Sequence, residues 1–169
     1  YFSPEDRLKG LTLQTAEWRR PPANTIPTDA KAAGLYMICT LSKHKAEKDG
    51  FTDALMLDYE GKVAESTGSN IFFVFDGELH TPIPHCFLDG ITRQTAISIA
   101  EKQGIKVVQR DIYPEEIKDA QEIFLTGSAV EINPVRKIDD LEFKVGKVTS
   151  MISDLYLSEV DKNYKIDNS

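Results

Sequence analysis

Short apolar segments separated by tight-turn dipeptides run through the first half of the chain, and this pattern constrains the fold most. The segments are 54–57, 62–64, 70–75 and 79–81. Glu60-Gly61 lies between the first two and Asp76-Gly77 between the last two. Such dipeptides favour the tight turns that join antiparallel strands. We therefore predict short strands connected as hairpins.

Other segments predict the remaining strands and the helices. Alternating polarity predicts a strand over 11–18, ended by Arg19-Arg20-Pro21-Pro22. Further strands are predicted at 106–112, 122–125 and 130–138, and Pro134 places the last at a sheet edge. Helices are predicted at 28–48, 92–103 and 147–160, with a short one from Pro114, a frayed tail at 161–169, and stops at Gly50 and Gly104. The pattern predicts one α/β domain over residues 1–169.

Composition and charge exclude several classes of protein. The chain has 169 residues, 41% of them hydrophobic, which is enough for one domain with a sizeable core. A net charge of −7 disfavours nucleic acid, since phosphate binding needs a basic surface. The longest apolar runs, such as 71–75, are too short to cross a bilayer, and we recognise no secretory signal. We expect neither a nucleic-acid nor a membrane partner.

The cysteines and histidines indicate a reduced, metal-free protein. Cys39 and Cys86 have apolar neighbours, which predicts buried free thiols in a reducing cytosol and hence a cytoplasmic location. His80 and His85 have no further histidine or cysteine at zinc spacing, so we predict no metal site.

Lys31 is the first candidate for chemistry. It lies behind a proline-bounded loop, in the first turn predicted for the 28–48 helix, whose apolar face we expect to comprise Ala30, Ala33, Met37, Leu41 and Ile38. A lysine at the positive end of a helix dipole loses its proton more readily, and a neutral amine can hold a cofactor aldehyde as a Schiff base. The alternative is a solvated lysine at a helix start.

Three later segments carry candidate binding groups. Glu65 ends a strand before the small polar residues 66–70, which aims a carboxylate at a cleft; a solvated strand-end glutamate is the alternative. The glycine loop 88–93 runs into a helix start, an arrangement that binds anions, although a simple N-cap would look the same. The turn 126–129 has small side chains that let a ligand approach the backbone, or it is an ordinary β-turn.

In combination and in this order, these segments resemble the branched-chain aminotransferases. The match rests on Asn24-Thr25-Ile26-Pro27 with Lys31 and Tyr36, on the segments 63–72 and 88–93, and on 124–132. These enzymes are class IV aminotransferases of fold type IV that use pyridoxal phosphate. The resemblance implies an α/β fold, namely their C-terminal large domain, a mixed-sheet pseudo-barrel flanked by helices.

The resemblance also implies a role for each matched residue. Lys31 would carry pyridoxal 5′-phosphate, Tyr36 would bind its phenolic oxygen, and Glu65 would keep its pyridine nitrogen protonated. Leu88 would pack on the ring, and Ile91, Thr92 and Ser128 would bind the phosphate. Ser128 and Ala129 would present amides to the substrate carboxylate. Asn70 fits as a support residue, and Arg20 matches a family arginine to which we assign no chemical role.

The implied activity is transamination of leucine, isoleucine or valine with 2-oxoglutarate. D-amino acid aminotransferase and aminodeoxychorismate lyase share the fold and cofactor and remain alternatives, as does a cofactor-free interaction module. Because the resemblance covers one half of such an enzyme, we expect an N-terminal small domain to be missing and the fragment alone to be inactive. We also expect a homodimer or a larger homo-oligomer.

Overall fold

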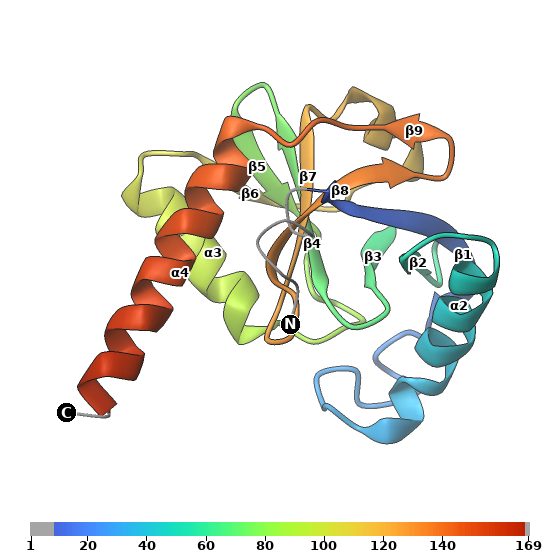
Figure 1. Cartoon of the computed structure of the whole chain (residues 1–169). Coiled ribbons are helices and arrows are strands. Elements are labelled where there is room, and N and C mark those ends of the chain that lie inside the picture. The colour runs from blue at the N-terminus through green and yellow to red at the C-terminus, as the bar shows by residue number, and fades with distance from the viewer. Residues whose placement is uncertain (1–8, 168–169) are drawn as a thin grey trace.

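The computed structural model describes residues 9–167, with side chains described as far as residue 160. The strands of this part form one mixed sheet with helices on its outside (Figure 1). In chain order the strands are β1 (Leu11–Arg20), β2 (Asp53–Asp58), β3 (Val63–Ser66), β4 (Asn70–Phe75), β5 (Glu78–Thr81), β6 (Val107–Gln109), β7 (Glu122–Gly127), β8 (Glu131–Ile138) and β9 (Leu141–Glu142). The helices are η1 (Ala33–Leu35), α2 (Met37–Lys48), α3 (Ile91–Lys102), η2 (Pro114–Asp119) and α4 (Lys147–Asp167).

The sheet curls until its two edges meet. Its strand order is β3-β2-β1-β8-β7-β4-β5-β6, with β9 paired to β8. At opposite ends of this order, the Val63 amide of β3 donates a hydrogen bond of 2.8 Å to the carbonyl of Ile112, beyond the end of β6. Lys62 and Asp111 form an ion pair of 2.8 Å beside it. The predicted mixed-sheet pseudo-barrel flanked by helices is therefore confirmed.

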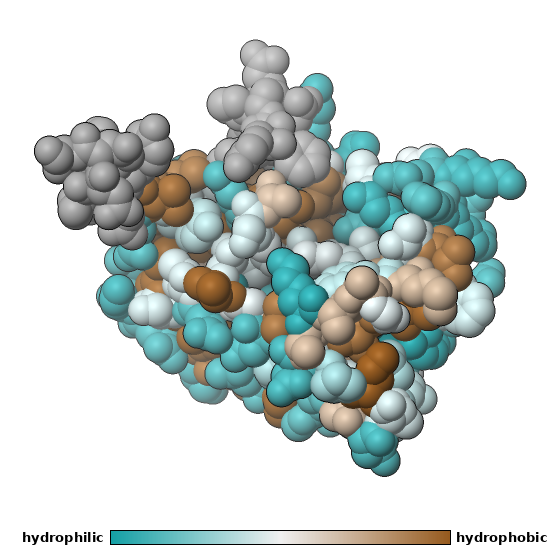
Figure 2. Space-filling view, turned by 90° about the horizontal axis from the view of Figure 1, so that it is seen from below, coloured by the Kyte–Doolittle hydropathy of each residue, from teal (hydrophilic) through white to brown (hydrophobic). Residues whose placement is uncertain are grey.

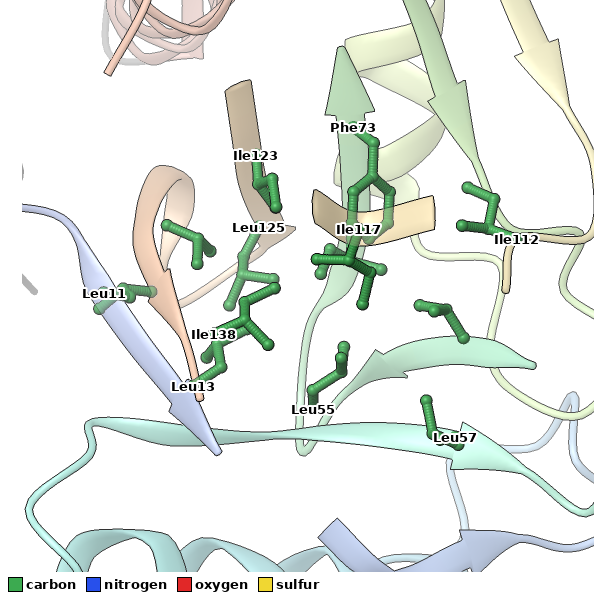
Figure 3. Packing of buried hydrophobic residues seen from close by; sticks show 13 residues of the cluster. Leu11, Leu13, Leu55, Leu57, Phe73, Ile112, Ile117, Ile123, Leu125 and Ile138 are labelled. Atoms are coloured by element: carbon green, nitrogen blue, oxygen red, sulfur yellow. The ribbon is translucent and has the colours of Figure 1, made fainter. Parts of the chain in front are cut away.

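Alternate residues of each strand face opposite sides of this barrel, as the period of two requires. Ile71 and Phe73 of β4 point into the barrel, whereas Phe72 and Val74 pack against α3 and α4. The interior side chains converge from several strands and from η2 (Figure 3). On the other side of the molecule, α2 covers β1 and β2 (Figure 1). β2, β4 and β7 are thus buried on both faces over most of their length.

Both predicted hairpins are present. β2 and β3 are antiparallel around Glu60-Gly61, and β4 and β5 are antiparallel around Asp76-Gly77. Asp76 and Gly77 have φ angles of 48° and 79°, the left-handed pair that a two-residue hairpin turn requires. The 92–103 helix is confirmed as α3, and Gly104 follows it with a φ of 75°.

The prediction that 130–138 forms an edge strand is wrong. β8 lies in the middle of the sheet, between β7 and β1. It pairs with β7 as far as Pro134 and with β1 from Val135 onward. Pro134 therefore lies where the strand changes partner, and its missing N–H costs little there.

The predicted helix over 28–48 is also wrong in its first part. The chain makes two separate four-residue turns before η1, closed by hydrogen bonds from the Thr25 amide to the Pro22 carbonyl and from the Ala30 amide to the Pro27 carbonyl, and α2 begins only at Met37. Lys31 thus lies in a loop, so the helix-dipole argument for its amine does not hold. The predicted apolar face is wrong as well, since the buried side chains of α2 are Cys39, Ser42 and Ala46. Of the residues assigned to that face, Ala30, Ala33, Met37 and Leu41 are exposed and Ile38 is half-buried.

Several element lengths differ from the prediction. β1 continues through Arg19 to Arg20 and β7 continues to Gly127, each two residues past its predicted end. β6 spans only Val107–Gln109, because the chain beyond it turns inward and Ile112 enters the barrel core. α4 continues to Asp167, past the predicted end at residue 160, and residues 168–169 lie outside the described part. None of the helices described is long and apolar enough to cross a membrane.

A buried glutamate from the sheet caps α4. Both carboxylate oxygens of Glu122, in β7, accept hydrogen bonds from the start of this helix. Its Oε1 lies 3.2 Å from the Val148 amide. Its Oε2 lies 2.8 Å from the Thr149 amide and 2.7 Å from the Thr149 hydroxyl. The carboxylate thus satisfies amides that have no acceptor inside the helix.

Replacing Glu122 with Ala is expected to lower the free energy of unfolding by about 2 kcal/mol, because it leaves these donors without an acceptor. Urea denaturation followed by circular dichroism measures the change. The exposed Glu101 of α3 is the matched control, and Glu101→Ala is expected to change stability by less than about 0.5 kcal/mol. Equal effects of the two substitutions would contradict the capping role.

Candidate active site

A cavity of about 330 Å³ opens where the ends of several elements meet. The loop before α2, the start of α3 and the β7–β8 turn all lie at the lower edge of the molecule in Figure 1. Seen from below, this face mixes hydrophobic and hydrophilic side chains (Figure 2). The lining residues are Lys31, Tyr36, Glu65, Gly68, Ser69, Asn70, Leu88, Gly90, Ile91, Thr92, Thr126, Gly127 and Ser128.

One wall of the cavity comes from the loop that precedes α2. Lys31 lies in this loop with an exposed side chain, and Tyr36 is the half-buried N-cap of α2. Burial raises the pKa of Tyr36, and the nearby Glu65 carboxylate raises it further. The loop, rather than a helical turn, is what allows both side chains to line the same cavity. The wall thus presents a primary amine and a phenol that stays protonated at neutral pH.

Glu65 forms the floor of the cavity and is buried. It lies in β3 opposite Met56 of β2, whose side chain faces α2. Because directly opposed residues of antiparallel strands point to the same face, the carboxylate is directed toward the α2 side of the sheet. Burial raises its pKa to about 8, although the Arg20 guanidinium, with Nε 3.4 Å from Oε1, opposes the shift.

Asn70 fixes the loop that leads into α3. Its amide nitrogen donates a hydrogen bond of 2.9 Å to the Leu88 carbonyl, and its oxygen accepts one of 3.2 Å from the Gly90 amide. Asn70 is therefore the predicted support residue. The N-cap of α3 is Gly90, which has no side chain to accept a hydrogen bond from the helix. The first amides of the helix, at Ile91 and Thr92, therefore have no side-chain cap, and both residues line the cavity.

The β7–β8 turn closes the opposite side. Thr126, Gly127 and Ser128 line the cavity, whereas Ala129, predicted to act with Ser128, is exposed and lies outside the lining. The Thr126 hydroxyl is buried and has no hydrogen-bond partner among the described residues. A side chain at position 127 would approach the Ser69 hydroxyl to within 2.9 Å. Any larger residue at position 127 would therefore force the Ser69 side chain to move.

Three contributors to this site had no role predicted from the sequence. Thr126 and Ser69 lie inside the segments 124–132 and 63–72, but nothing in their pattern shows that they face a cavity. Arg20 was noted without a role, and only the fold reveals that its side chain reaches Glu65. No group of three acidic, histidine or cysteine side chains that could hold a metal ion occurs in the part described.

This arrangement suits one kind of ligand. An electrophilic carbon could react with the Lys31 amine, a basic nitrogen could share a proton with the buried Glu65 carboxyl, and an anionic group could accept hydrogen bonds from the α3 amides. An orphaned hydroxyl at Thr126 offers a further polar contact. Seven of the eight predicted site residues line this one cavity.

Comparison with known proteins places the chain in a family. The family model for class IV amino-transferases matches residues 1–138, and the chain belongs to that family. Among curated proteins, a probable branched-chain-amino-acid aminotransferase from Rickettsia bellii is 42% identical over 159 residues, which cover 94% of this chain and 55% of that protein. The chain thus spans about half the length of the curated relatives it matches.

Solved structures of aminotransferases share the fold of this chain. A branched-chain aminotransferase from the thermophilic archaeon Thermoproteus uzoniensis, solved with norvaline, superposes with a TM-score of 0.85 at 39% identity, over 88% of this chain and 50% of that chain. A Brucella abortus aminotransferase bound to the cofactor PLP gives a TM-score of 0.85 at 38% identity, over 89% and 54%. The fold is that of the fold-type IV aminotransferases, as the resemblance implied.

Replacing Gly90 with Ala is expected to destabilise the α3 entry loop. The new Cβ would lie 2.5 Å from the Asn70 Oδ1 atom and would displace the side chain that holds this loop. We expect a loss of about 1–3 kcal/mol in the free energy of unfolding. In an Asn70→Ala background the same substitution should cost much less, because the clash is gone. Additive losses in this double-mutant cycle would contradict the contact.

The raised pKa of Glu65 predicts a pH-dependent stability. Between the ordinary glutamate value of 4.5 and the native value of about 8, the folded protein keeps a proton that the unfolded chain has lost. Raising the pH across this window therefore lowers the free energy of unfolding. Urea denaturation at several pH values should show this decline in the wild type and a flatter profile in Glu65→Gln. Glu101→Gln is the exposed control, and identical profiles for wild type and Glu65→Gln would contradict the assignment.

Proposed function

We propose that this chain carries the cofactor-binding half of a pyridoxal 5′-phosphate-dependent branched-chain-amino-acid transaminase. The reaction would transfer the amino group of leucine, isoleucine or valine to 2-oxoglutarate, giving a branched-chain 2-oxo acid and glutamate. The observation that carries the proposal is the cavity that combines the Lys31 amine, the Tyr36 phenol and the buried Glu65 carboxyl with the uncapped α3 amides.

The groups around the cavity fit the cofactor. Glu65 offers a buried carboxyl for a ring nitrogen, and Thr126 has a buried hydroxyl without a partner among the described residues. The uncapped start of α3, at Ile91 and Thr92, suits a phosphate because free N–H groups and the helix dipole both favour an anion. Of these groups, the Thr126 hydroxyl is left without a hydrogen-bond partner by the described residues.

Four further lining residues, Tyr36, Leu88, Thr92 and Ser128, receive roles on this basis. Tyr36 would donate a hydrogen bond to the cofactor's phenolic oxygen, and Leu88 would pack on the ring. Thr92 and Ser128 would add hydroxyl donors to the phosphate-binding amides of the α3 start. For Ser128 and Ala129 we further propose that their amides receive the substrate carboxylate.

Lys31 carries the chemistry of the proposed reaction. Pyridoxal phosphate, when bound, supplies the aldehyde that captures an amine and a ring that accepts electrons from the substrate Cα. The Lys31 amine would hold the cofactor at rest and, once released, would remove the proton from the substrate Cα as a general base and then, as an acid, deliver it to the C4′ carbon of the cofactor. Glu65 would support this step by sharing a proton with the ring nitrogen.

We propose that an N-terminal small domain completes the active site and supplies most of the side-chain pocket, so that residues 1–169 alone turn over poorly. We further propose a homodimer or larger homo-oligomer, which agrees with exposed hydrophobic side chains at Trp18, Met37 and Leu41. A cytoplasmic location agrees with the free thiols of Cys39 and Cys86.

Lys31→Ala tests the proposed attachment of the cofactor. Incubation with pyridoxal phosphate, borohydride reduction and peptide mass mapping should find the adduct on Lys31 in the wild type and none at that position in the variant. The exposed Lys48 of α2 provides the control, because Lys48→Ala should leave the adduct intact. A wild-type protein labelled only at other lysines would overturn the proposal. Product formation from leucine, isoleucine, valine and D-alanine then tests the substrate class.

A further inference from the structure

Arg20 is a buried cation that none of the roles above uses. It is the last residue of β1, it is 1% exposed, and it is among the largest fully buried side chains. Its Nε atom donates a hydrogen bond of 3.2 Å to the Cys86 carbonyl and lies 3.4 Å from Glu65 Oε1. Its Nη1 atom donates one of 3.1 Å to the Leu35 carbonyl. Burying an arginine without partners would carry a large desolvation penalty. The carbonyl and carboxylate contacts offset this penalty and fix the position of the guanidinium.

The three contacts lead to three separate walls of the cavity. Leu35 precedes Tyr36, the N-cap of α2, and Cys86 lies in the loop that continues to Leu88. Glu65 is itself the floor. One guanidinium therefore joins the loop before α2, the end of β3 and the loop before α3, which are far apart in the sequence.

The Arg20 charge also acts on the cavity. It is the strongest influence that lowers the pKa of Glu65, and it lowers the pKa of Tyr36 as well, in both cases against the effect of burial. Without this cation, both groups would hold their protons to higher pH. The two side chains proposed to contact the ends of the cofactor ring thus share one nearby positive charge.

We propose that Arg20 is a positioning residue that holds Tyr36, Glu65 and the Leu88 loop in one cofactor-binding arrangement and balances the charge of the Glu65 carboxylate. The inference rests on the proposed function, because it concerns the same cavity. It adds two separable roles for one side chain. The first is a positive charge, which any cation could supply, and the second is a fork of donors that reaches acceptors on three walls of the cavity, which only arginine provides.

Substitutions separate the two roles. Arg20→Lys keeps the charge and loses the fork, whereas Arg20→Met keeps much of the volume and loses both. Arg93→Met is the matched control, since Arg93 is equally buried and anchors loops through Asp89, Pro82 and Gln109 but does not influence the pKa of Glu65. A general loss of a buried arginine would affect all of these variants alike.

The first measurement needs no cofactor. Infrared difference spectra over a pH titration follow the neutral carboxyl band of Glu65, assigned by its absence in Glu65→Gln. The wild-type midpoint is expected at about 8. Arg20→Met should move the midpoint up by about 1–3 pH units, while Arg20→Lys and Arg93→Met should leave it near the wild-type value. An unmoved midpoint in Arg20→Met would overturn the charge role.

The second measurement is the dissociation constant of pyridoxal phosphate, from absorbance titration. Arg20→Lys should weaken binding by about tenfold through the lost carbonyl contacts. If Arg20→Lys bound pyridoxal phosphate with wild-type affinity, the positioning role of Arg20 would be overturned. This variant tests that role even if Arg20→Met does not fold. If the wild-type protein forms no adduct at Lys31, the proposed function fails, whereas the Glu65 titration still tests Arg20 on its own.

Discussion

The change of partner along β8 is the constraint on which the architecture depends. Its first half pairs antiparallel with β7 and its second half parallel with β1, so two parts of the sheet are joined at an angle within one strand. The sheet then curls, and the Val63–Ile112 hydrogen bond links its edges. As a result, the ends of β3 and β7 and the start of β4 gather at one rim, where the cavity forms.

The cavity combines rigid and adaptable walls. Glu65, Asn70 and Thr126 belong to paired strands and are buried, so their positions are set by the sheet. The side that carries Lys31 consists of short turns closed by local hydrogen bonds, such as Ala30 to Pro27 and Leu35 to Ala32. In the proposed function, the Glu65 carboxyl that would contact the ring nitrogen therefore lies on a strand, whereas the Lys31 amine that would hold the cofactor lies on a loop.

Much of this molecule could be predicted from the sequence because the signals were local. The hairpin turns, α3 and the glycine stops follow from dipeptides and periodicity that act within a few residues. The interior position of β8 could not be predicted, since Pro134 argues for an edge unless the change of partner is known. The loop at Lys31 was missed for a similar reason: Ala30, Ala32 and Ala33 favour a helix, whereas the Leu35 carbonyl is held by the distant Arg20.

The residues that line the site were predicted, but of those that support it only Asn70 was, and its hydrogen-bond partners were not. Seven of the eight named positions meet in one cavity, although each alone had an ordinary alternative. The contacts of Arg20 and the hydrogen bonds of Asn70 join residues that are remote in sequence, and no spacing rule reveals them. A family resemblance therefore identifies residues that face a ligand more readily than residues that hold those side chains in place.

The local hydrogen bonding of the Lys31 loop has a consequence for handling the protein. Between Pro22 and Ala32 the backbone hydrogen bonds stay within local turns. Such a segment opens at little energetic cost and is readily cut by proteases. An occupant of the cavity that bonds to Lys31 would tether this segment to the strand-borne walls. Resistance to limited digestion between Pro22 and Ala32 would then report occupancy in a crude preparation, without any need for colour or turnover.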